Sequence, residues 1–266
     1  MLVAVLAVAV LLISPSPKHG GSPNANDINT LYWIGLSLGA IIFVIVEGTL
    51  IYSLFKFRAR RGGPEPAQIR GNTTLEVGWT LGAAAFLVIL TAVTFVYLGD
   101  IEHPARSKPN AQLAGTQFAA LHQGSVPGGK KLTVRVNGQQ YLWRFKYDDI
   151  GNKQVFSYYD MYVPVGITVV LKITSSDVIH SWWIPELGPK TDATPGYEVE
   201  SWFRIDKPGE FEGNCAELCG ENHADMRARV IAVPGDQFAA WKERQAADIQ
   251  KSQAYLSLQR KVRGEN

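Results

Sequence analysis

Three apolar runs interrupt an otherwise polar pattern in the first hundred residues: Leu2–Ile13, Leu31–Phe55 and Val77–Leu98. The last two exceed the roughly 20 residues that a helix needs to cross a bilayer, so they predict a transmembrane hairpin. The first run has only twelve residues. It fits either the core of a signal peptide or a frayed apolar N-terminus.

A short basic segment, Lys56–Arg61 followed by Arg70, separates the two predicted spans. Basic loops remain in the cytoplasm, so everything after Leu98 is expected on the extracytoplasmic side. Glu47 is the one charged residue of the first span. A carboxylate at this depth usually faces protein or a water path, and the alternative is a group that is protonated or bonded within a helix packed on a partner subunit. We favour burial against a partner and assign Glu47 no role.

After residue 130 the pattern changes to short segments of alternating apolar and polar residues, separated by turn residues. Alternation with period two is typical of half-buried strands, and no helical pattern intervenes, which favours an antiparallel sandwich. From Phe238 onward the pattern predicts a terminal helix or tail. The expected strands are Leu132–Val136, Tyr141–Tyr147, Tyr158–Val163, Ile167–Thr174, Val199–Ile205 and Arg227–Val233.

These patterns divide the chain into segments with different expected structures. A candidate signal peptide occupies residues 1–17, and a linker covers Lys18–Asn29. The transmembrane hairpin is expected at residues 30–100. A polar connector that includes a lid follows at 101–130, then the β-domain at 131–235 and the C-terminal helix or tail at 236–266.

Composition supports a membrane protein with a local thiol site. Charged residues make up only 19% of the chain, which together with the long apolar runs argues against a cytosolic enzyme. The two cysteines, Cys215 and Cys219, lie four positions apart, so a disulfide between them would close only a very short loop. We therefore interpret them as part of one local site.

The segment from Cys215 to Met226 carries the strongest chemical signal of the sequence. It brings two thiols, the imidazole of His223 and the thioether of Met226 within twelve residues. Thiolate and thioether groups select soft metals, and imidazole suits copper. Zinc would require four strong ligands, and a blue copper site uses only one cysteine, so the second thiol exceeds what a single copper needs.

His180 begins an aromatic segment, His180-Ser-Trp-Trp, directly after an apolar strand. Taken alone, such a histidine is more often an ordinary turn residue than a ligand. Loops from different strand pairs meet at one end of a sandwich, so His180 can approach Cys215 despite their separation in sequence. Together with the downstream cluster, a ligand role is favoured.

These motifs resemble subunit II of the haem–copper cytochrome c oxidases. The similar segments are Glu76–Thr80, Ser176–Trp182, Pro185–Gly196 and Cys215–Met226, and the likeness extends from about Tyr32 to Trp241. The resemblance implies a two-helix transmembrane hairpin followed by an all-β, cupredoxin-like sandwich. It also implies a binuclear CuA centre of two copper ions in that sandwich.

The resemblance further assigns a role to each residue of the site. It implies bridging thiolates from Cys215 and Cys219, terminal nitrogen ligands from His180 and His223, a weak thioether ligand from Met226 and a weak carbonyl ligand from Glu217. The Glu217 carboxylate is a candidate ligand of a magnesium ion shared with the catalytic subunit.

Partners and location also follow from the resemblance. It implies the haem-bearing catalytic subunit I and subunit III as partners, cytochrome c as electron donor, and the cell membrane of a bacterium as location. The chain carries no Cys-x-x-Cys-His, so we expect no haem on it, and we expect no nucleic-acid partner.

The chain departs from the family pattern at two places. The family's Gln-Trp-x-Trp segment aligns with Gln140 to Trp143, so Tyr141 replaces the first tryptophan. Both Tyr141 and Trp143 are candidates for the point where electrons arrive, although strand aromatics are more often core residues.

In the second span Ala83 replaces an expected proline. Glu76 matches a family glutamate near the mouth of a proton path, or it caps its helix at the interface.

The predicted β-domain is slightly acidic. Residues 131–234 contain eleven Lys and Arg against fourteen Asp and Glu, a net charge of −3, although the whole chain carries +2. An acidic surface near the copper ligands would attract a basic cytochrome c, while the alternative is an ordinary solvated surface.

Taken together, these features favour the electron-transfer subunit of a respiratory oxidase. It would take electrons from cytochrome c at CuA and pass them to haem in the catalytic subunit, where oxygen is reduced to water and protons are pumped. The nearest alternative is the copper-bearing subunit of a nitric oxide reductase. A copper chaperone and a disulfide-carrying binding module are further alternatives. The intact ligand set disfavours a quinol oxidase, and the length disfavours nitrous oxide reductase.

Overall fold

The computed structural model describes residues 20–58, 63, 65, 67–108, 131–148 and 154–264. Two compact units form: the described part of one covers residues 29–99, and that of the other covers residues 20–28 and 100–264. The candidate signal peptide at residues 1–17 lies outside the described residues, as do residues 109–130 of the predicted connector.

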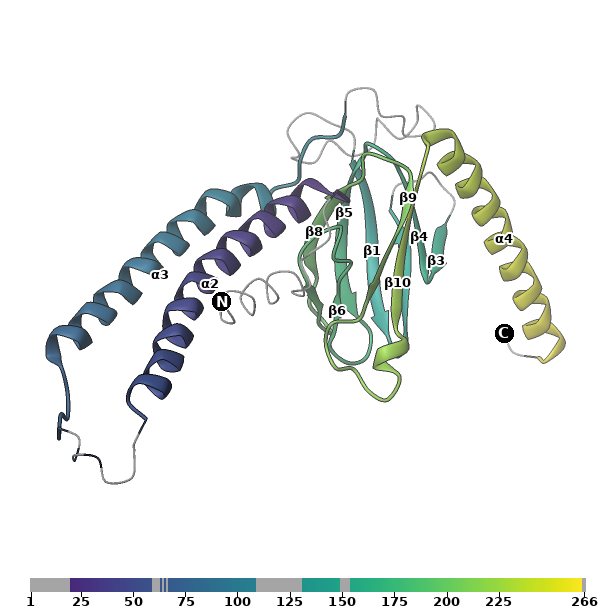
Figure 1. The fold of residues 1–266 in the computed structure, drawn as a ribbon. Coiled ribbons are helices and arrows are strands. Elements are labelled where there is room, and N and C mark those ends of the chain that lie inside the picture. The colour runs from purple at the N-terminus through teal and green to yellow at the C-terminus, as the bar shows by residue number, and fades with distance from the viewer. Residues whose placement is uncertain are drawn as a thin grey trace. The chain divides into compact units, whose positions relative to one another are not determined.

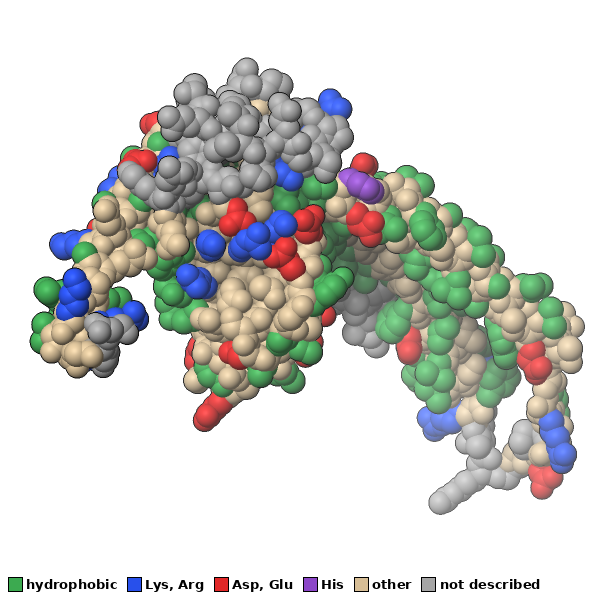
Figure 2. Space-filling model, turned by 180° about the vertical axis from the view of Figure 1, so that it is seen from behind, with side chains coloured by type: hydrophobic (Ala, Val, Ile, Leu, Met, Phe, Trp, Pro, Cys, Tyr) green, Lys and Arg blue, Asp and Glu red, His purple; other side chains and the backbone are tan. Residues whose placement is uncertain are grey.

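Two long helices, α2 (Pro23–Lys56) and α3 (Thr73–Glu102), contain the predicted spans (Figure 1). Each is long and apolar enough to cross a membrane, with a mean hydropathy of 2.3 in its most apolar stretch. Large side chains such as Leu54 and Val96 are exposed, and Figure 2 shows hydrophobic side chains along both helices. Exposing such an apolar surface to water is unfavourable, whereas the apolar interior of a bilayer accommodates it. A helix also pairs its backbone N–H and C=O groups internally, as a lipid environment requires.

The second unit contains a β-sandwich. Its larger sheet has five strands in the order β3-β2-β1-β5-β8, its smaller sheet has the order β4-β10-β9, and β6 pairs with β7 separately. The strands are β1 (Lys131–Gln139), β2 (Leu142–Tyr147), β3 (Val155–Tyr158), β4 (Asp160–Pro164), β5 (Thr168–Ser175), β6 (His180–Trp182), β7 (Thr191–Ala193), β8 (Val199–Arg204), β9 (Gly209–Asn214) and β10 (Arg227–Val233).

The core lies between the two sheets and confirms the alternating pattern. Along β1 every second residue is buried, including Val134 and Val136, which are fully enclosed. Phe145 from the larger sheet and Val163 and Val230 from the smaller sheet join the same core. Complete burial of an apolar side chain of this size stabilises a fold by about 1.5–3 kcal/mol, so this core fixes the strand ends that carry the site.

Strand direction differs from the prediction of an antiparallel sandwich. Strand β1 runs parallel to β5, and β4 runs parallel to β10. The chain leaves the larger sheet at Tyr159, whose left-handed φ of 64° turns it into the smaller sheet, and it returns as β5. The predicted strand Tyr158–Val163 is therefore the end of β3 and most of β4. Because β3, β4 and β5 alternate between the two sheets, no tight hairpin joins them, and a short turn does not make each strand antiparallel to the one before it.

The linker predicted at Lys18–Asn29 was wrong from Pro23 onward, because α2 begins there, and Asn24 and Ala25 in its first turn are buried. The Asn24 side-chain amide donates to the Trp202 carbonyl (2.8 Å), and the Arg204 N–H donates to Ser22 Oγ (3.1 Å). These bonds hold the start of α2 against β8, an outer strand of the larger sheet.

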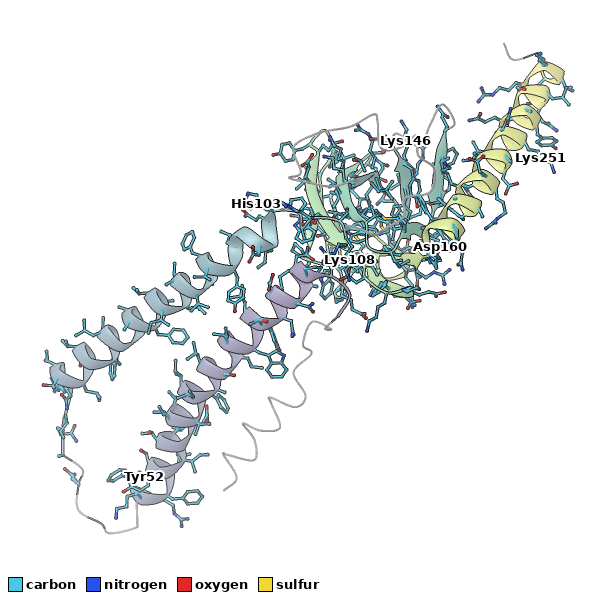
Figure 3. The ribbon with its side chains drawn as sticks, turned by 90° about the horizontal axis from the view of Figure 1, so that it is seen from above. Tyr52, His103, Lys108, Lys146, Asp160 and Lys251 are labelled. Atoms are coloured by element: carbon cyan, nitrogen blue, oxygen red, sulfur yellow. The ribbon has the colours of Figure 1, made fainter. Side chains whose placement is uncertain are left out.

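The predicted C-terminal helix is confirmed as α4 (Gly235–Val262). Phe238, Trp241, Ala246 and Ile249 are its buried residues, and the Trp241 ring stacks on Tyr162 with centroids 4.8 Å apart. From residue 250 onward the described side chains of α4 are all exposed, as seen around Lys251 in Figure 3. Only the first half of the helix therefore contributes to the core.

Candidate metal centre

The candidate ligands lie at the ends of strands in the second unit. His180 opens β6, Cys215 follows directly after β9, and Met226 precedes β10. The Cys215 N–H donates to the Met226 carbonyl (2.9 Å), which closes the loop between β9 and β10 at its base. Because β9 and β10 are paired up to Asn214 and Arg227, the sheet itself holds the two ends of this loop together.

The two thiols face one another without forming a disulfide. Cys215 Sγ lies 3.9 Å from Cys219 Sγ, whereas a disulfide bond measures about 2.05 Å. Both cysteines are free and buried. The arrangement leaves two sulfur ligands available on the same loop.

Each thiol has its own imidazole neighbour. His180 Nδ1 lies 3.8 Å from Cys215 Sγ, and His223 Nδ1 lies 3.6 Å from Cys219 Sγ. Two atoms that each lie about 2.0–2.3 Å from one ion at a tetrahedral angle are separated by roughly 3.5 Å. The observed separations therefore fit coordination of soft or borderline ions.

Two weaker donors complete the cluster. Met226 Sδ lies 3.9 Å from Cys219 Sγ, and the Glu217 carbonyl oxygen lies 3.3 Å from Cys215 Sγ. The ligand atoms of His180 and both cysteines are all within 4.8 Å of one another. All six predicted residues thus gather at one place, with thiolate, imidazole, thioether and carbonyl donors.

Burial of the cluster affects the Cys219 thiol in particular. His180 and Met226 are fully buried, while His223 is only half-buried. Burial, and next the negative charge that Cys215 would carry, raises the pKa of the Cys219 thiol to about 11. A bound cation would favour the thiolates, so metal binding would release protons.

Asp177 fixes the orientation of the His180 ring. Its Oδ1 lies 2.8 Å from His180 Nε2, which leaves Nδ1 facing the sulfur atoms. Burial alone would raise the pKa of Asp177, but hydrogen bonds from the Gln140 N–H, His180 and the Val178 N–H together lower it to about 2. The carboxylate is therefore ionised and accepts the Nε2 proton, as outer partners of metal-bound histidines commonly do.

The two aromatic candidates for electron arrival have different surroundings. The Trp143 ring is completely buried, with its centroid 5.2 Å from Trp182 and 5.9 Å from His180. Tyr141 is partly exposed, and its hydroxyl accepts a hydrogen bond from the Glu221 N–H (3.0 Å). Of the two, only Tyr141 reaches the protein surface.

Glu76 and Glu47, the two glutamates discussed from the sequence, lie apart from this cluster in sequence and occupy the long helices. Glu76 Oε1 accepts from the Asn72 N–H (3.2 Å), and Asn72 Oδ1 accepts from the Leu75 N–H (3.1 Å). This reciprocal pair caps the start of α3. Glu47 lies within α2.

The sequence reasoning missed Gly138 as a residue of the site. A Cβ at this position would lie 2.8 Å from His180 Cδ2 and 3.2 Å from Trp143. The imidazole therefore packs directly against the β1 backbone. A glycine inside an otherwise alternating strand is the signal for such close approach.

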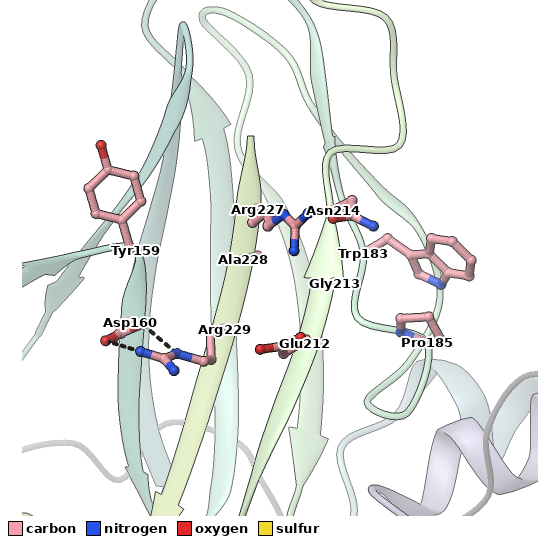
Figure 4. A pocket seen from close by; sticks show the side chains of 10 residues that line it. All are labelled: Tyr159, Asp160, Trp183, Pro185, Glu212, Gly213, Asn214, Arg227, Ala228 and Arg229. Carbon is pink, nitrogen blue, oxygen red and sulfur yellow. Dashed lines mark hydrogen bonds and ion pairs between the residues drawn. The ribbon is translucent and has the colours of Figure 1, made fainter. Parts of the chain in front are cut away.

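A separate groove of about 390 Å³ lies on the smaller sheet and is lined in part by Tyr159, Trp183 and Asn214 (Figure 4). Across its strands the Arg229 guanidinium pairs with both Asp160 oxygens at 2.8 Å. These opposite charges compensate one another within the sheet, and none of the six clustered ligands lines the groove.

Two protein-family descriptions match the chain. Residues 17–97 match "Cytochrome C oxidase subunit II, transmembrane domain", and residues 156–233 match "Cytochrome C oxidase subunit II, periplasmic domain". With the two apolar helices, these matches describe a membrane protein with a periplasmic domain.

Curated relatives agree along most of the chain. Cytochrome c oxidase subunit 2 of Alkalihalophilus pseudofirmus is 33% identical over 92% of this chain, which spans 66% of that longer relative. Cytochrome c oxidase subunit 2 of Thermostichus vulcanus is 31% identical over 90% of this chain and 84% of the relative.

A solved structure, the periplasmic domain of subunit II of cytochrome oxidase (CoxB) of Bradyrhizobium japonicum, is 33% identical and covers 44% of this chain and 94% of its own, with a TM-score of 0.42. The family descriptions and the curated relatives converge, and they confirm the resemblance predicted from the motifs. The chain belongs to the cytochrome c oxidase subunit II family, a component of haem–copper oxidoreductase complexes.

Proposed function

We propose that this chain accepts electrons from cytochrome c at a binuclear copper centre and passes them to haem in the catalytic subunit. One observation carries the proposal: two buried thiols lie 3.9 Å apart, and each has a different imidazole nitrogen beside it. This pairwise arrangement supports two ions bridged by two sulfurs better than one closed tetrahedral ion.

In this proposal the six clustered residues divide the ligand roles among them. Cys215 and Cys219 would hold both ions through shared thiolates, and His180 and His223 would hold one ion each. Met226 and the Glu217 carbonyl would be weaker ligands. When bound, the copper pair would supply a one-electron carrier.

The surrounding residues suit electron transfer because they resist movement. The ligands sit at strand ends, the Cys215 N–H is bonded to the Met226 carbonyl, and Asp177 holds His180. A rigid set of ligands changes little between oxidation states, which keeps the reorganisation cost small. Oxygen reduction and proton pumping then belong to the catalytic subunit.

The exposed residues around the site support a soluble, basic electron donor. Glu217, Glu221 and Asp225 are exposed beside the ligands, and Leu218 is 82% exposed. Acidic groups around an apolar residue would speed the encounter with a basic cytochrome c in a salt-dependent way. We place the domain outside the cytoplasmic membrane of a bacterium, with the basic loop inside and subunits I and III beside the helices.

Three finer assignments belong to the same proposal. The exposed Glu217 carboxylate is available for a magnesium ion shared with the catalytic subunit. Tyr141 receives the electron at the surface, with Trp143 behind it. Glu76 caps α3 and, in the assembled complex, lies near the mouth of a proton path.

Metal analysis of the purified full-length chain in detergent tests the proposal. After copper is added we expect about two coppers per chain and a paramagnetic signal from one electron shared over two equivalent ions. A single zinc, or a Cys215–Cys219 disulfide that refuses metal, would refute it. In the purified complex, consumption of oxygen rather than nitric oxide separates the two candidate acceptors. None of the comparisons favours the nitric oxide reductase alternative.

A further inference from the structure

The turn between β1 and β2 lies between the two loops that carry the proposed ligands. On one side, the Gln140 N–H donates to Asp177 Oδ2 (2.7 Å). The other oxygen of that carboxylate, Oδ1, is bonded to His180 Nε2 (2.8 Å). The Gln140 backbone is therefore linked through one carboxylate to the first imidazole.

The same residue also reaches the cysteine loop. The Gln140 side-chain amide donates to the Cys219 carbonyl at 2.6 Å, a short bond in a partly buried setting. Next to it, the Tyr141 hydroxyl accepts from the Glu221 N–H (3.0 Å). Gly220 lets this contact form, because a Cβ there would lie 2.5 Å from the Tyr141 hydroxyl.

Among the described residues, the backbone hydrogen bonds that join the His180 loop directly to the cysteine loop lie near Cys215. Near Cys215, the Ala216 N–H donates to the Ser181 carbonyl (2.9 Å), which ties the two loops directly. Cys219 lies further along the loop, between the exposed residues Leu218 and Gly220. Because an exposed loop segment moves unless it is bonded, the position of Cys219 relative to His180 depends on the turn.

We propose that Gln140 is a positioning residue: its backbone and side chain together fix the distance between the His180 side and the Cys219 side of the metal centre. The proposal rests on the proposed copper function for its consequence, because both sulfurs must keep their spacing for an electron to be shared equally. It assigns Gln140 no contact with the metal.

Gln140→Glu tests this role with almost no change in size. The substitution replaces the amide donor by a carboxylate oxygen, which faces the Cys219 carbonyl without a proton, while the backbone bond to Asp177 remains. Gln139→Glu is the matched control. It makes the same change in charge one residue earlier, where the Gln139 amide lies 3.4 Å from the exposed Ser176 hydroxyl.

The first measurement is amide hydrogen exchange of the metal-free full-length chain in detergent. Loss of one hydrogen bond changes an equilibrium by about fivefold or more, so we expect residues 215–226 to exchange about fivefold faster in Gln140→Glu and at the original rate in Gln139→Glu. Faster exchange across the whole sandwich would report unfolding. In that case the exchange of residues 215–226 is compared between the unaltered chain and Gln140→Met, which removes the donor without adding charge.

The second measurement is the paramagnetic spectrum after copper is added. We expect Gln140→Glu to lose the pattern of two equivalent coppers and Gln139→Glu to keep it. Unchanged exchange and spectra in both Gln140 variants, or equal changes in the Gln139 control, would overturn the positioning role. If the unaltered chain takes up no copper, the proposed function fails, and the exchange measurement still decides whether Gln140 holds the loop.

Discussion

At the residue scale, the environment of His180 determines what the centre can bind. Its Nε2 is bonded to Asp177, its Cδ2 packs against Gly138, and its ring meets Trp143 edge-on. With these sides of the ring occupied, Nδ1 faces Cys215. A ligand held in this way loses little freedom on binding, which favours affinity.

Removing the Asp177 charge should weaken copper binding. In Asp177→Asn the side chain cannot accept from both the His180 Nε2–H and the Gln140 N–H, so the imidazole loses its fixed tautomer. Loss of such an outer partner typically lowers metal affinity about 10- to 100-fold, measurable by competition with a copper chelator. Asp236→Asn, which makes the same change in charge at the start of α4, should retain the original affinity.

Adding a methyl group at Gly138 should disturb the ring directly. Gly138→Ala places a Cβ 2.8 Å from His180 Cδ2, so the ring must move. We expect a loss of about 1–3 kcal/mol in unfolding free energy and an altered copper spectrum. Gly209→Ala is the control, because a Cβ there lies 3.6 Å from the Phe211 ring, an ordinary contact. Equal effects of both substitutions would show that strand glycines in general, and not the His180 contact, are responsible.

At the element scale, the ends of β6, β9 and β10 place the ligands, and α4 supports the sheets behind them. The first half of α4 is packed against β3 and β4, and its side chains Phe238 and Trp241 are buried. Trp241 lies against both Tyr162 and Tyr147, with centroids 4.8 and 5.1 Å apart. The Tyr147 hydroxyl in turn bonds the backbone of Tyr162, so the helix, β2 and β4 form one unit.

Truncating the buried aromatic of α4 should therefore destabilise the whole domain. We expect Trp241→Ala to cost about 3–5 kcal/mol, as for other buried aromatics, and to lower the melting temperature measured by circular dichroism. Tyr255→Ala, in the exposed half of α4, should change stability by less than about 0.5 kcal/mol. A small effect at Trp241 would mean that α4 is not part of the cooperative unit.

At the scale of the whole molecule, the metal ligands belong to one compact unit, and residues 29–99, which include most of α2 and α3, belong to the other. The exposed apolar surface of the helices favours their insertion into lipid. The metal centre is not part of that surface. The ligands are held by the sandwich core. Loss of the metal should consequently leave membrane insertion intact.

Cys215→Ser and His223→Ala test this independence. We expect both variants to lose the spectrum of the copper pair and the oxidation of cytochrome c, because each removes a strong ligand. Both should remain in the membrane fraction after alkaline extraction, as we also expect of the unaltered chain. A variant that kept both coppers and full turnover would contradict the ligand assignment, and one released from the membrane would contradict the independence of the units.

The sequence alone predicted the local elements wherever one physical signal dominated. Long apolar runs marked α2 and α3, and β10 was predicted with its observed limits, Arg227–Val233, because apolar and polar residues alternate along it. Strands β6, β7 and β9 were not predicted because they are short or contain few apolar residues. Soft donors close together in sequence also identified Cys215–Met226 as a candidate metal site.

Only the tertiary structure decided which distant residues meet. The parallel pairing of β1 with β5 arises because the chain changes sheets at Tyr159, and no local pattern encodes the direction of a returning strand. The buried start of α2 and the bonds of Gln140 to Asp177 and Cys219 likewise join residues far apart in sequence. Residue type fixes which chemistry is available, whereas packing fixes which atoms come within bonding distance.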